Sequence, residues 1–155
     1  MERKKYRVFL DSNVILSGLF SDKGSPRLIL DLLCLDLPAL VGLTGRFNQM
    51  EVERNLERKL PATLPTFRLY LPKMKLEVIA LPTPEDLCTL AGSADEKDLP
   101  ALASALAGRA DFFATGDKSL ISAINEKAAF PFRPLSPAEF LATVLPGLLG
   151  GSPRR

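Results

Sequence analysis

Apolar and polar residues follow one another along the chain in blocks whose lengths suit short strands and medium-sized helices. Runs rich in Val, Leu, Ile and Phe fall at residues 7–10, 39–43, 76–81 and 110–115, and each predicts a buried strand. Residues 130–135 predict a fifth strand. Because its prolines cannot donate to a β-ladder, we expect that strand at an edge of the sheet.

Between these runs, apolar residues recur at helical spacing. The predicted helices cover residues 14–20, 25–36, 47–60, 63–71, 94–108, 118–128 and a stretch from 136, with a short one after Pro82. Strands that alternate with helices predict an α/β fold of three layers, in which helices cover both faces of a mainly parallel, about five-stranded sheet. We expect one domain over residues 1–148 and a disordered tail over 149–155.

The helix predicted at 47–60 is strongly charged, and few of its residues suit a core. We expect its buried positions to be Met50, Val52, Leu56 and Leu60. The remaining polar residues of this helix would then face solvent, apart from any that serve a site.

Composition excludes several kinds of chemistry. The chain has 155 residues, a net charge of +2, two cysteines and no histidine. Without histidine, serine or cysteine nucleophiles lack their usual base, and a zinc site lacks its usual ligands. Cys34 and Cys88 are expected to be free, buried thiols in a reducing compartment. Any hydrolytic chemistry must therefore come from carboxylates, lysines or a metal ion.

The basic residues at the N-terminus are followed by an apolar run, as in a signal peptide. Asp11 and Asn13 interrupt that run too early for a signal-peptide core. No uninterrupted apolar stretch reaches the length of a membrane span. We expect a cytoplasmic protein with no membrane partner.

Four acidic residues fall where an α/β sheet gathers its functional groups, beyond the carboxyl ends of the strands. Asp11 follows the first strand and Asp117 follows the fourth. Glu51 lies early in the charged helix after the second strand, and Asp98 lies in the first turn of the helix before the fourth. Carboxylates that share one rim repel each other unless a cation lies between them. Oxygen ligands suit Mg²⁺ or Mn²⁺, and one or two such ions support phosphoryl displacement.

Each acid also has a simpler interpretation. Asp11 can cap the following helix, and Asp117 can be a turn residue. Asp98 suits the first turn of a helix, and Glu51 can pair with Arg54 on the helix surface. A metal ligand can also cap a helix, so the joint arrangement favours a metal site.

Three segments together resemble the PIN domain family, in particular its bacterial toxin-like members related to VapC-type ribonucleases. They are V-F-L-D-S-N-V-I-L-S-G-L-F, E-V-E-R-N-L and D-E-K-D-L-P-A-L-A-S-A-L-A-G-R-A-D-F-F-A-T-G-D-K-S-L, within residues 8–120. The resemblance implies a metal-dependent endoribonuclease with an acidic pocket that holds Mg²⁺ or Mn²⁺. Its four acids, both as metal ligands and as catalytic groups, correspond to Asp11, Glu51, Asp98 and Asp117.

The resemblance also implies roles for neighbouring polar residues. Asn13 and Thr115 match residues that support the family's site by hydrogen bonding, and Ser12 is expected to serve as a cap and a support together. Asp95 and Glu53 compete for two of the acidic positions, and the flanking residues favour Asp98 and Glu51.

Two further features of the sequence bear on these acids. Asp95 is also expected to cap the helix at 94–108. The segment G-L-T-G-R-F-N-Q-M before Glu51 departs from the family's pattern, which weakens the assignment of that residue. A non-catalytic RNA- or protein-binding PIN-like module is therefore the alternative function.

RNA would have to be attracted by cations near the pocket. Arg46, Arg54 and Lys118 are the candidates carried forward, and ordinary solvated helix faces explain them equally well. Lys97 is among the other basic residues considered. The resemblance implies an antitoxin protein as partner. The apolar helix over residues 28–35 and the apolar C-terminal helix favour a homodimer, although burial in the core explains them equally well.

Overall fold

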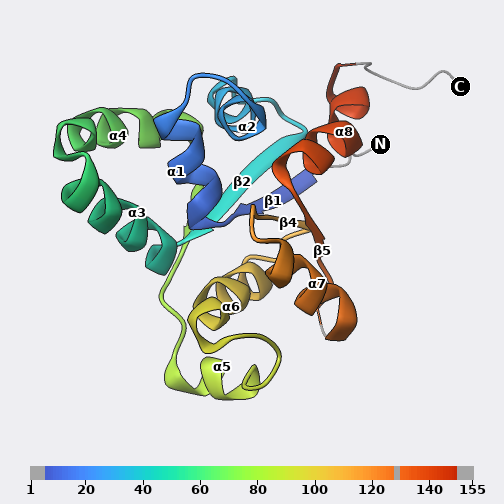
Figure 1. The fold of residues 1–155 in the computed structure, drawn as a ribbon. Coiled ribbons are helices and arrows are strands. Elements are labelled where there is room, and N and C mark those ends of the chain that lie inside the picture. The colour runs from blue at the N-terminus through green and yellow to red at the C-terminus, as the bar shows by residue number, and fades with distance from the viewer. Residues whose placement is uncertain (1–5, 128–129, 150–155) are drawn as a thin grey trace, which may run out of the picture.

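The computed structural model describes residues 6–127 and 130–149, and within them five parallel strands form one sheet (Figure 1). The strands are β1 (Tyr6–Leu10), β2 (Leu40–Gly45), β3 (Glu77–Ile79), β4 (Phe112–Ala114) and β5 (Arg133–Leu135). Their order is β3-β2-β1-β4-β5, so the strand predicted for an edge is at an edge. The predicted α/β fold with a five-stranded parallel sheet is confirmed.

Helices cover both faces of this sheet (Figure 1). They are α1 (Ser12–Phe20), α2 (Ser25–Cys34), α3 (Arg46–Lys59), α4 (Leu64–Tyr70), α5 (Pro84–Thr89), α6 (Leu99–Ala107), α7 (Lys118–Lys127) and α8 (Pro137–Leu149). Short 3₁₀ turns lie at η1 (Pro61–Thr63), η2 (Leu71–Met74) and η3 (Glu96–Asp98). Pro26 stands in the first turn of α2, where a proline costs no hydrogen bond.

Two hydrophobic cores lie on opposite faces of the sheet, because successive side chains of a strand point to opposite sides. Val8 and Leu10 of β1 pack into one core, together with α1, α2, α4 and α8. Phe9, between them, packs into the other core with Phe113 of β4 and with helix α6. These three of the five β1 side chains are fully buried, and β1 is the central strand of the sheet.

The chain reverses its direction of travel across the sheet at β1. It passes from β1 to β2 and on to β3, then crosses back through α5 and α6 to β4 on the other side of β1. In a parallel sheet, a crevice opens at such a reversal, beyond the carboxyl ends of the two neighbouring strands, here β1 and β4. Here those ends are Leu10 and Ala114, which are also register partners.

Arg7 ties the opposite end of the sheet together. Its Nη2 donates to the carbonyl of Gly108 (2.6 Å) and pairs with Oε1 of Glu77 (2.7 Å). Its backbone N–H donates to Oδ2 of Asp111 (2.9 Å). This one side chain therefore joins β1 to β3 and to the end of α6, far from the crevice.

The two edge strands are short. β3 and β5 have three residues each, and Pro134 at the middle of β5 has no N–H to offer. Glu77 begins β3 and holds the guanidinium of Arg7.

The buried face of α3 differs from the predicted one. Val52 and Leu56 are fully buried, as expected, but Met50 is 37% exposed and Leu60 is 46% exposed. Asn48 is fully buried in their place. The face that packs against the molecule therefore follows a four-residue spacing through 48, 52 and 56, so the apolar identity of Met50 and Leu60 was misleading.

The predicted cap at Asp95 is also wrong. Asp95 precedes η3, and its side chain makes no capping hydrogen bond. The α-helix begins only at Leu99, since the residues between form a 3₁₀ turn.

The apolar face of α2 is mostly used within the chain. Ile29, Leu30, Leu32 and Leu33 are buried, while Leu28 and Leu35 are exposed. This burial removes most of the reason to expect a homodimer from that helix.

Both cysteines are free thiols, but Cys88 is exposed and Cys34 is only half-buried, against the expectation that both are buried. No helix within residues 6–127 and 130–149 is long and apolar enough to cross a membrane. The predicted tail starts at Leu149, which instead ends α8, and its residues 150–155 lie outside the described part of the chain.

Candidate functional site

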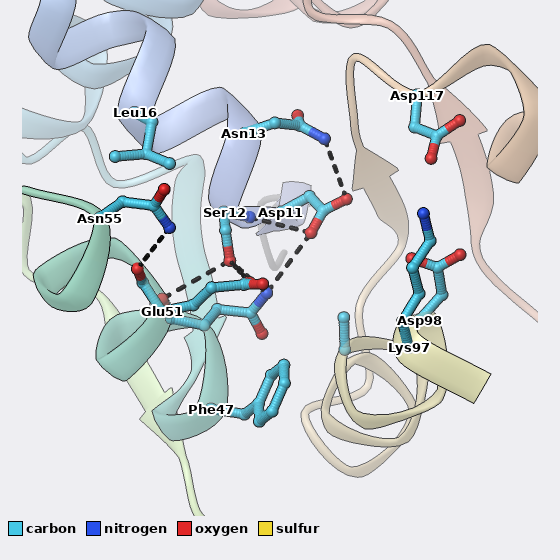
Figure 2. Close-up of a pocket in the computed structure, with 12 residues that line it drawn as sticks. Asp11, Ser12, Asn13, Leu16, Phe47, Glu51, Asn55, Lys97, Asp98 and Asp117 are labelled. Carbon is cyan, nitrogen blue, oxygen red and sulfur yellow. Dashed lines mark hydrogen bonds between the residues drawn. The ribbon is translucent and has the colours of Figure 1, made fainter. Parts of the chain in front are cut away.

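A pocket of about 250 Å³ opens beyond the carboxyl ends of β1 and β4, at the reversal of the sheet (Figure 2). It is lined by Asp11, Ser12, Asn13, Leu16, Phe47, Asn48, Glu51, Asn55, Lys97, Asp98, Ala101 and Asp117. All four acids singled out from the sequence are among these residues, whereas their competitors Asp95 and Glu53 are not. Figure 2 shows Asp11 between Glu51 on one side and Asp98 and Asp117 on the other.

Asp11 is held in place by hydrogen bonds to both of its carboxylate oxygens. Oδ1 accepts from the backbone N–H of Ser12 (2.9 Å), so the side chain does cap α1. Oδ2 accepts from Oγ1 of Thr115 (2.8 Å). Burial raises the pKa of Asp11 to about 6; the two hydrogen bonds oppose this rise, and the nearby charges of Asp98 and Glu51 add to it. A cation in the pocket would stabilise the ionised form of Asp11 and so oppose this rise in its pKa.

Ser12, Asn48 and Glu51 form the α3 side of the site. Oγ of Ser12 donates to Oε1 of Glu51 (2.6 Å) and accepts from Nδ2 of Asn48 (2.8 Å). Nδ2 of Asn48 also reaches Oδ1 of Asp11 (3.4 Å). The unusual segment before Glu51 therefore leaves its side chain directed at the pocket, because α3 starts at Arg46 immediately after β2.

Asn13 and Thr115 form the opposite side. Nδ2 of Asn13 donates to Oγ1 of Thr115 (3.1 Å), and Oδ1 of Asn13 accepts from the backbone N–H of Gly116 (2.8 Å). Thr115 is fully buried, and its Oγ1 also accepts from the backbone N–H of Asp117 (3.1 Å). These bonds fix the loop after β4 against the start of α1.

Asp117 opens α7. Its Oδ1 accepts from Oγ of Ser119 (2.7 Å) and from the backbone N–H groups of Ser119 (3.0 Å) and Leu120 (3.2 Å). These hydrogen bonds, that of the Ser119 side chain first, hold the pKa of Asp117 below its usual range. All three fall on one oxygen, which leaves Oδ2 for a ligand.

Asp98 and Lys97 come from η3, on the far wall. Figure 2 shows the Lys97 side chain alongside Asp98, with its ammonium group directed toward Asp117. Burial raises the pKa of Asp98, against the attraction of Lys97 and together with the charge of Asp117. Lys97 also lowers the pKa of Asp117.

The basic residues that the sequence offered as RNA-binding candidates lie outside the pocket. Arg46, Arg54 and Lys118 are exposed, and none of them lines the pocket. Of the basic residues in the described part of the chain, Lys97 is the one in the pocket lining.

Asn48 is the site residue that the sequence pattern did not indicate. It is fully buried, and although its Nδ2 is used twice, its Oδ1 has no hydrogen-bond partner. Oδ1 points toward Gly45, where a Cβ atom would lie 2.9 Å from it and 2.8 Å from Oγ of Ser104. A signal was available, since Asn48 precedes Glu51 by three residues and so shares its helix face.

The pocket lining meets part of what a metal ion needs. The pocket offers carboxylate, amide and hydroxyl oxygens, the ligands that hard divalent cations prefer. Within the described residues, however, no three side chains of His, Cys, Asp or Glu gather closely enough to hold an ion as they stand. The four acids share the pocket without converging on one point.

Comparison with known proteins bears on the fold. No family model and no curated protein matches the sequence. Among solved structures, the chain is similar to one in the crystal structure of VapBC2 from Rickettsia felis bound to a DNA fragment from their promoter. The TM-score is 0.57 at 15% sequence identity, over 84% of this chain and 98% of that chain. At this identity the likeness shows a shared fold.

Proposed function

We propose that this chain is a PIN-like, metal-dependent endoribonuclease and the toxin component of a toxin–antitoxin pair. The observation that carries the proposal is that four carboxylates line one pocket at the point where the strand order reverses. They come from the residue after β1, from α3, from η3 and from the loop after β4. The fold shared with a chain of the VapBC2 complex supports it.

Asp11, Glu51, Asp98 and Asp117 would hold one or two Mg²⁺ or Mn²⁺ ions. The oxygen-only donor set fits such a cation, as do the raised pKa values of Asp11 and Asp98, which reflect carboxylates crowded in a poorly solvated space. When bound, the metal supplies activation of a water molecule and stabilisation of phosphate charge.

The surrounding side chains keep the carboxylates oriented. Thr115 and Asn13 hold Oδ2 of Asp11, and Ser12 holds Glu51. Fixed orientation matters because a ligand that must be ordered at each turnover costs conformational entropy. Lys97 would draw an RNA phosphate toward the pocket.

The partners follow from the same proposal. RNA is the substrate, and an antitoxin protein would block the pocket by placing an arginine against the carboxylates. The protein would act in the cytoplasm as one folded domain over residues 1–148, and a homodimer would have to use a surface other than the buried face of α2.

A non-catalytic RNA- or protein-binding module is the second candidate. It is favoured by one observation, that no three acidic side chains in the described ranges stand close enough to hold an ion. Such a module would keep the fold and the hydrogen-bonded Asp11 without turning over a substrate.

Incubation of the protein with a mixed RNA pool, with and without Mn²⁺, separates the two. We expect Mn²⁺-dependent cleavage that Asp11→Asn and Asp117→Asn each abolish. Asp22→Asn, at an exposed position outside the pocket, is the matched control and should cleave normally. RNA left intact with Mn²⁺, or cleavage that survives both pocket substitutions, would favour the binding module.

A further inference from the structure

Phe47 belongs to the pocket and to neither hydrophobic core. It lies in the first turn of α3, is half-buried, and lines the pocket beside the carboxylates. Neither core cluster of the described residues includes it, even among the partly buried side chains packed against them. The ring-to-ring contacts found there do not involve it either.

This position contrasts with those of the other phenylalanines near the sheet. Phe9, Phe67, Phe113 and Phe140 are fully buried and account for much of the two cores. An aromatic side chain gains most of its stabilisation from burial, so the half-buried ring of Phe47 contributes less to folding than these four rings do. Contact with a ligand in the pocket would explain why Phe47 lines it.

The pocket has an apolar part and an oxygen-rich part. Leu16, Phe47 and Ala101 supply the apolar lining, while the carboxylates supply the oxygens. Figure 2 shows Phe47 on the α3 side, across the pocket from Lys97 and Asp98. A ligand that fills such a hollow needs a flat apolar group next to an anionic group that binds through a metal ion at the carboxylates.

A nucleotide has both parts, a base with two π-faces and a phosphate. Proteins that bind single strands stack unpaired bases on aromatic side chains, and this stacking tolerates any base. A hollow of about 250 Å³ can take a group of about the size of one nucleotide.

We propose that Phe47 is a stacking platform for an unpaired base of single-stranded RNA, next to the phosphodiester held at the carboxylates. The inference rests on the proposed function and specifies its substrate as unpaired RNA. A base within a duplex would have to leave its stack to reach the ring, which costs free energy and disfavours duplex RNA.

The chain has no tryptophan, and this makes the contact directly observable. Phe47→Trp introduces a single indole whose fluorescence a stacked base quenches. Phe20→Trp, at a 48% exposed phenylalanine outside the pocket lining, is the matched control. Both are made in the full chain with Asp11→Asn, so that the strand stays intact, and are titrated with an RNA oligonucleotide in Mg²⁺.

We expect saturable quenching of the indole at 47, and none at 20, by a single-stranded oligonucleotide. The same oligonucleotide made abasic, or annealed into a duplex, should quench weakly. Equal quenching by the abasic strand or the duplex would overturn the inference, as would no quenching at 47.

Phe47→Ala tests the energetic role of the ring. It should weaken oligonucleotide binding roughly 5- to 100-fold, while Phe47→Trp retains binding. Thermal unfolding should change less than after truncation of a fully buried ring such as Phe9, because Phe47 is half-buried and lies outside both cores. If the base quenches the indole at 47 but the unmodified protein cleaves no RNA, the proposed nuclease activity is wrong and the stacking role of Phe47 stands. If RNA is cleaved but the indole is not quenched, the stacking role alone is wrong.

Discussion

Oγ of Ser12 donates a 2.6 Å hydrogen bond to Oε1 of Glu51, which joins the helix after β1 to the helix after β2. The two residues are 39 positions apart in sequence. The position of Glu51 at the pocket therefore depends on this contact with α1 as well as on its own helix α3.

Ser12→Ala should disturb both stability and activity. It removes the donor to Glu51 and the acceptor for Asn48, and unpaired polar groups in a buried position cost about 1–3 kcal/mol. Urea unfolding measures the loss, and Mn²⁺-dependent RNA cleavage should fall with it. Ser17→Ala on the exposed side of α1 is the control and should leave both unchanged.

The stability of the metal-free protein should fall as pH rises through the range set by Asp11. Below its ordinary value of 3.8 the carboxyl is neutral in folded and unfolded chains alike. With a folded pKa of about 6, ionisation then costs the folded state about 3 kcal/mol, fully developed only above pH 6. Unfolding free energies from pH 3.5 to 7, compared with those of Asp11→Asn, should diverge in this direction. Parallel curves would contradict the assignment.

Substitutions of Asp117 should distinguish its role as a helix cap from its role as a metal ligand. Asparagine caps a helix about as well as aspartate does, so Asp117→Asn should cost less than about 0.5 kcal/mol, while Asp117→Ala costs about 1 kcal/mol. Both should abolish metal-dependent cleavage if Oδ2 binds the ion. An Asp117→Asn protein with full activity would reduce this residue to a cap.

Lys97→Met should tighten Mn²⁺ binding and weaken RNA binding. The ammonium group interacts with Asp98 and Asp117 and so competes with a divalent ion. Lys97 is exposed, so removal of its charge is worth at most about 1 kcal/mol, or about fivefold in affinity by calorimetry. Lys118→Met, at an exposed lysine outside the pocket lining, is the control.

Gly45→Ala should strain the floor of the site. The added Cβ would lie 2.8 Å from Oγ of Ser104 and 2.9 Å from Oδ1 of Asn48, both fully buried side chains. Overpacking of this kind costs about 1–3 kcal/mol, and a displaced Asn48 would release Ser12 and Asp11. Thermal unfolding and RNA cleavage should both fall. Gly116→Ala, whose Cβ would meet Asn13 at 3.4 Å, should be tolerated.

The sequence allowed the sheet and the positions of its acids to be predicted, because these follow local rules. Strand ends are visible as the end of an apolar run, and Asp11 and Asp117 stand at two of them. Parallel strands bring their carboxyl ends to one edge of the sheet, and the pairing of β1 with β4 then places Asp11 and Asp117 at neighbouring strand ends.

The residues that were misjudged depend on packing between distant segments. The apolar Met50 is exposed, whereas the polar Asn48 is fully buried. Asn48 can be buried because it donates a hydrogen bond to Ser12 of α1, a partner that the sequence of α3 does not reveal. The sequence did not distinguish Lys97 from the other basic residues, because its place in the pocket lining depends on the 3₁₀ turn η3. Hydrophobic periodicity identifies an apolar face and is blind to a buried hydrogen-bonded one.

The short edges of the sheet also determine how this chain meets its neighbours at high concentration. Strand-to-strand growth into fibrils needs an edge with a long row of unpaired N–H and C=O groups. β5 has three residues with a proline at its centre, and β3 has three that begin with a charged glutamate engaged by Arg7. Neither edge is a suitable template, so concentrated protein that self-associates should do so through its helices and remain free of amyloid.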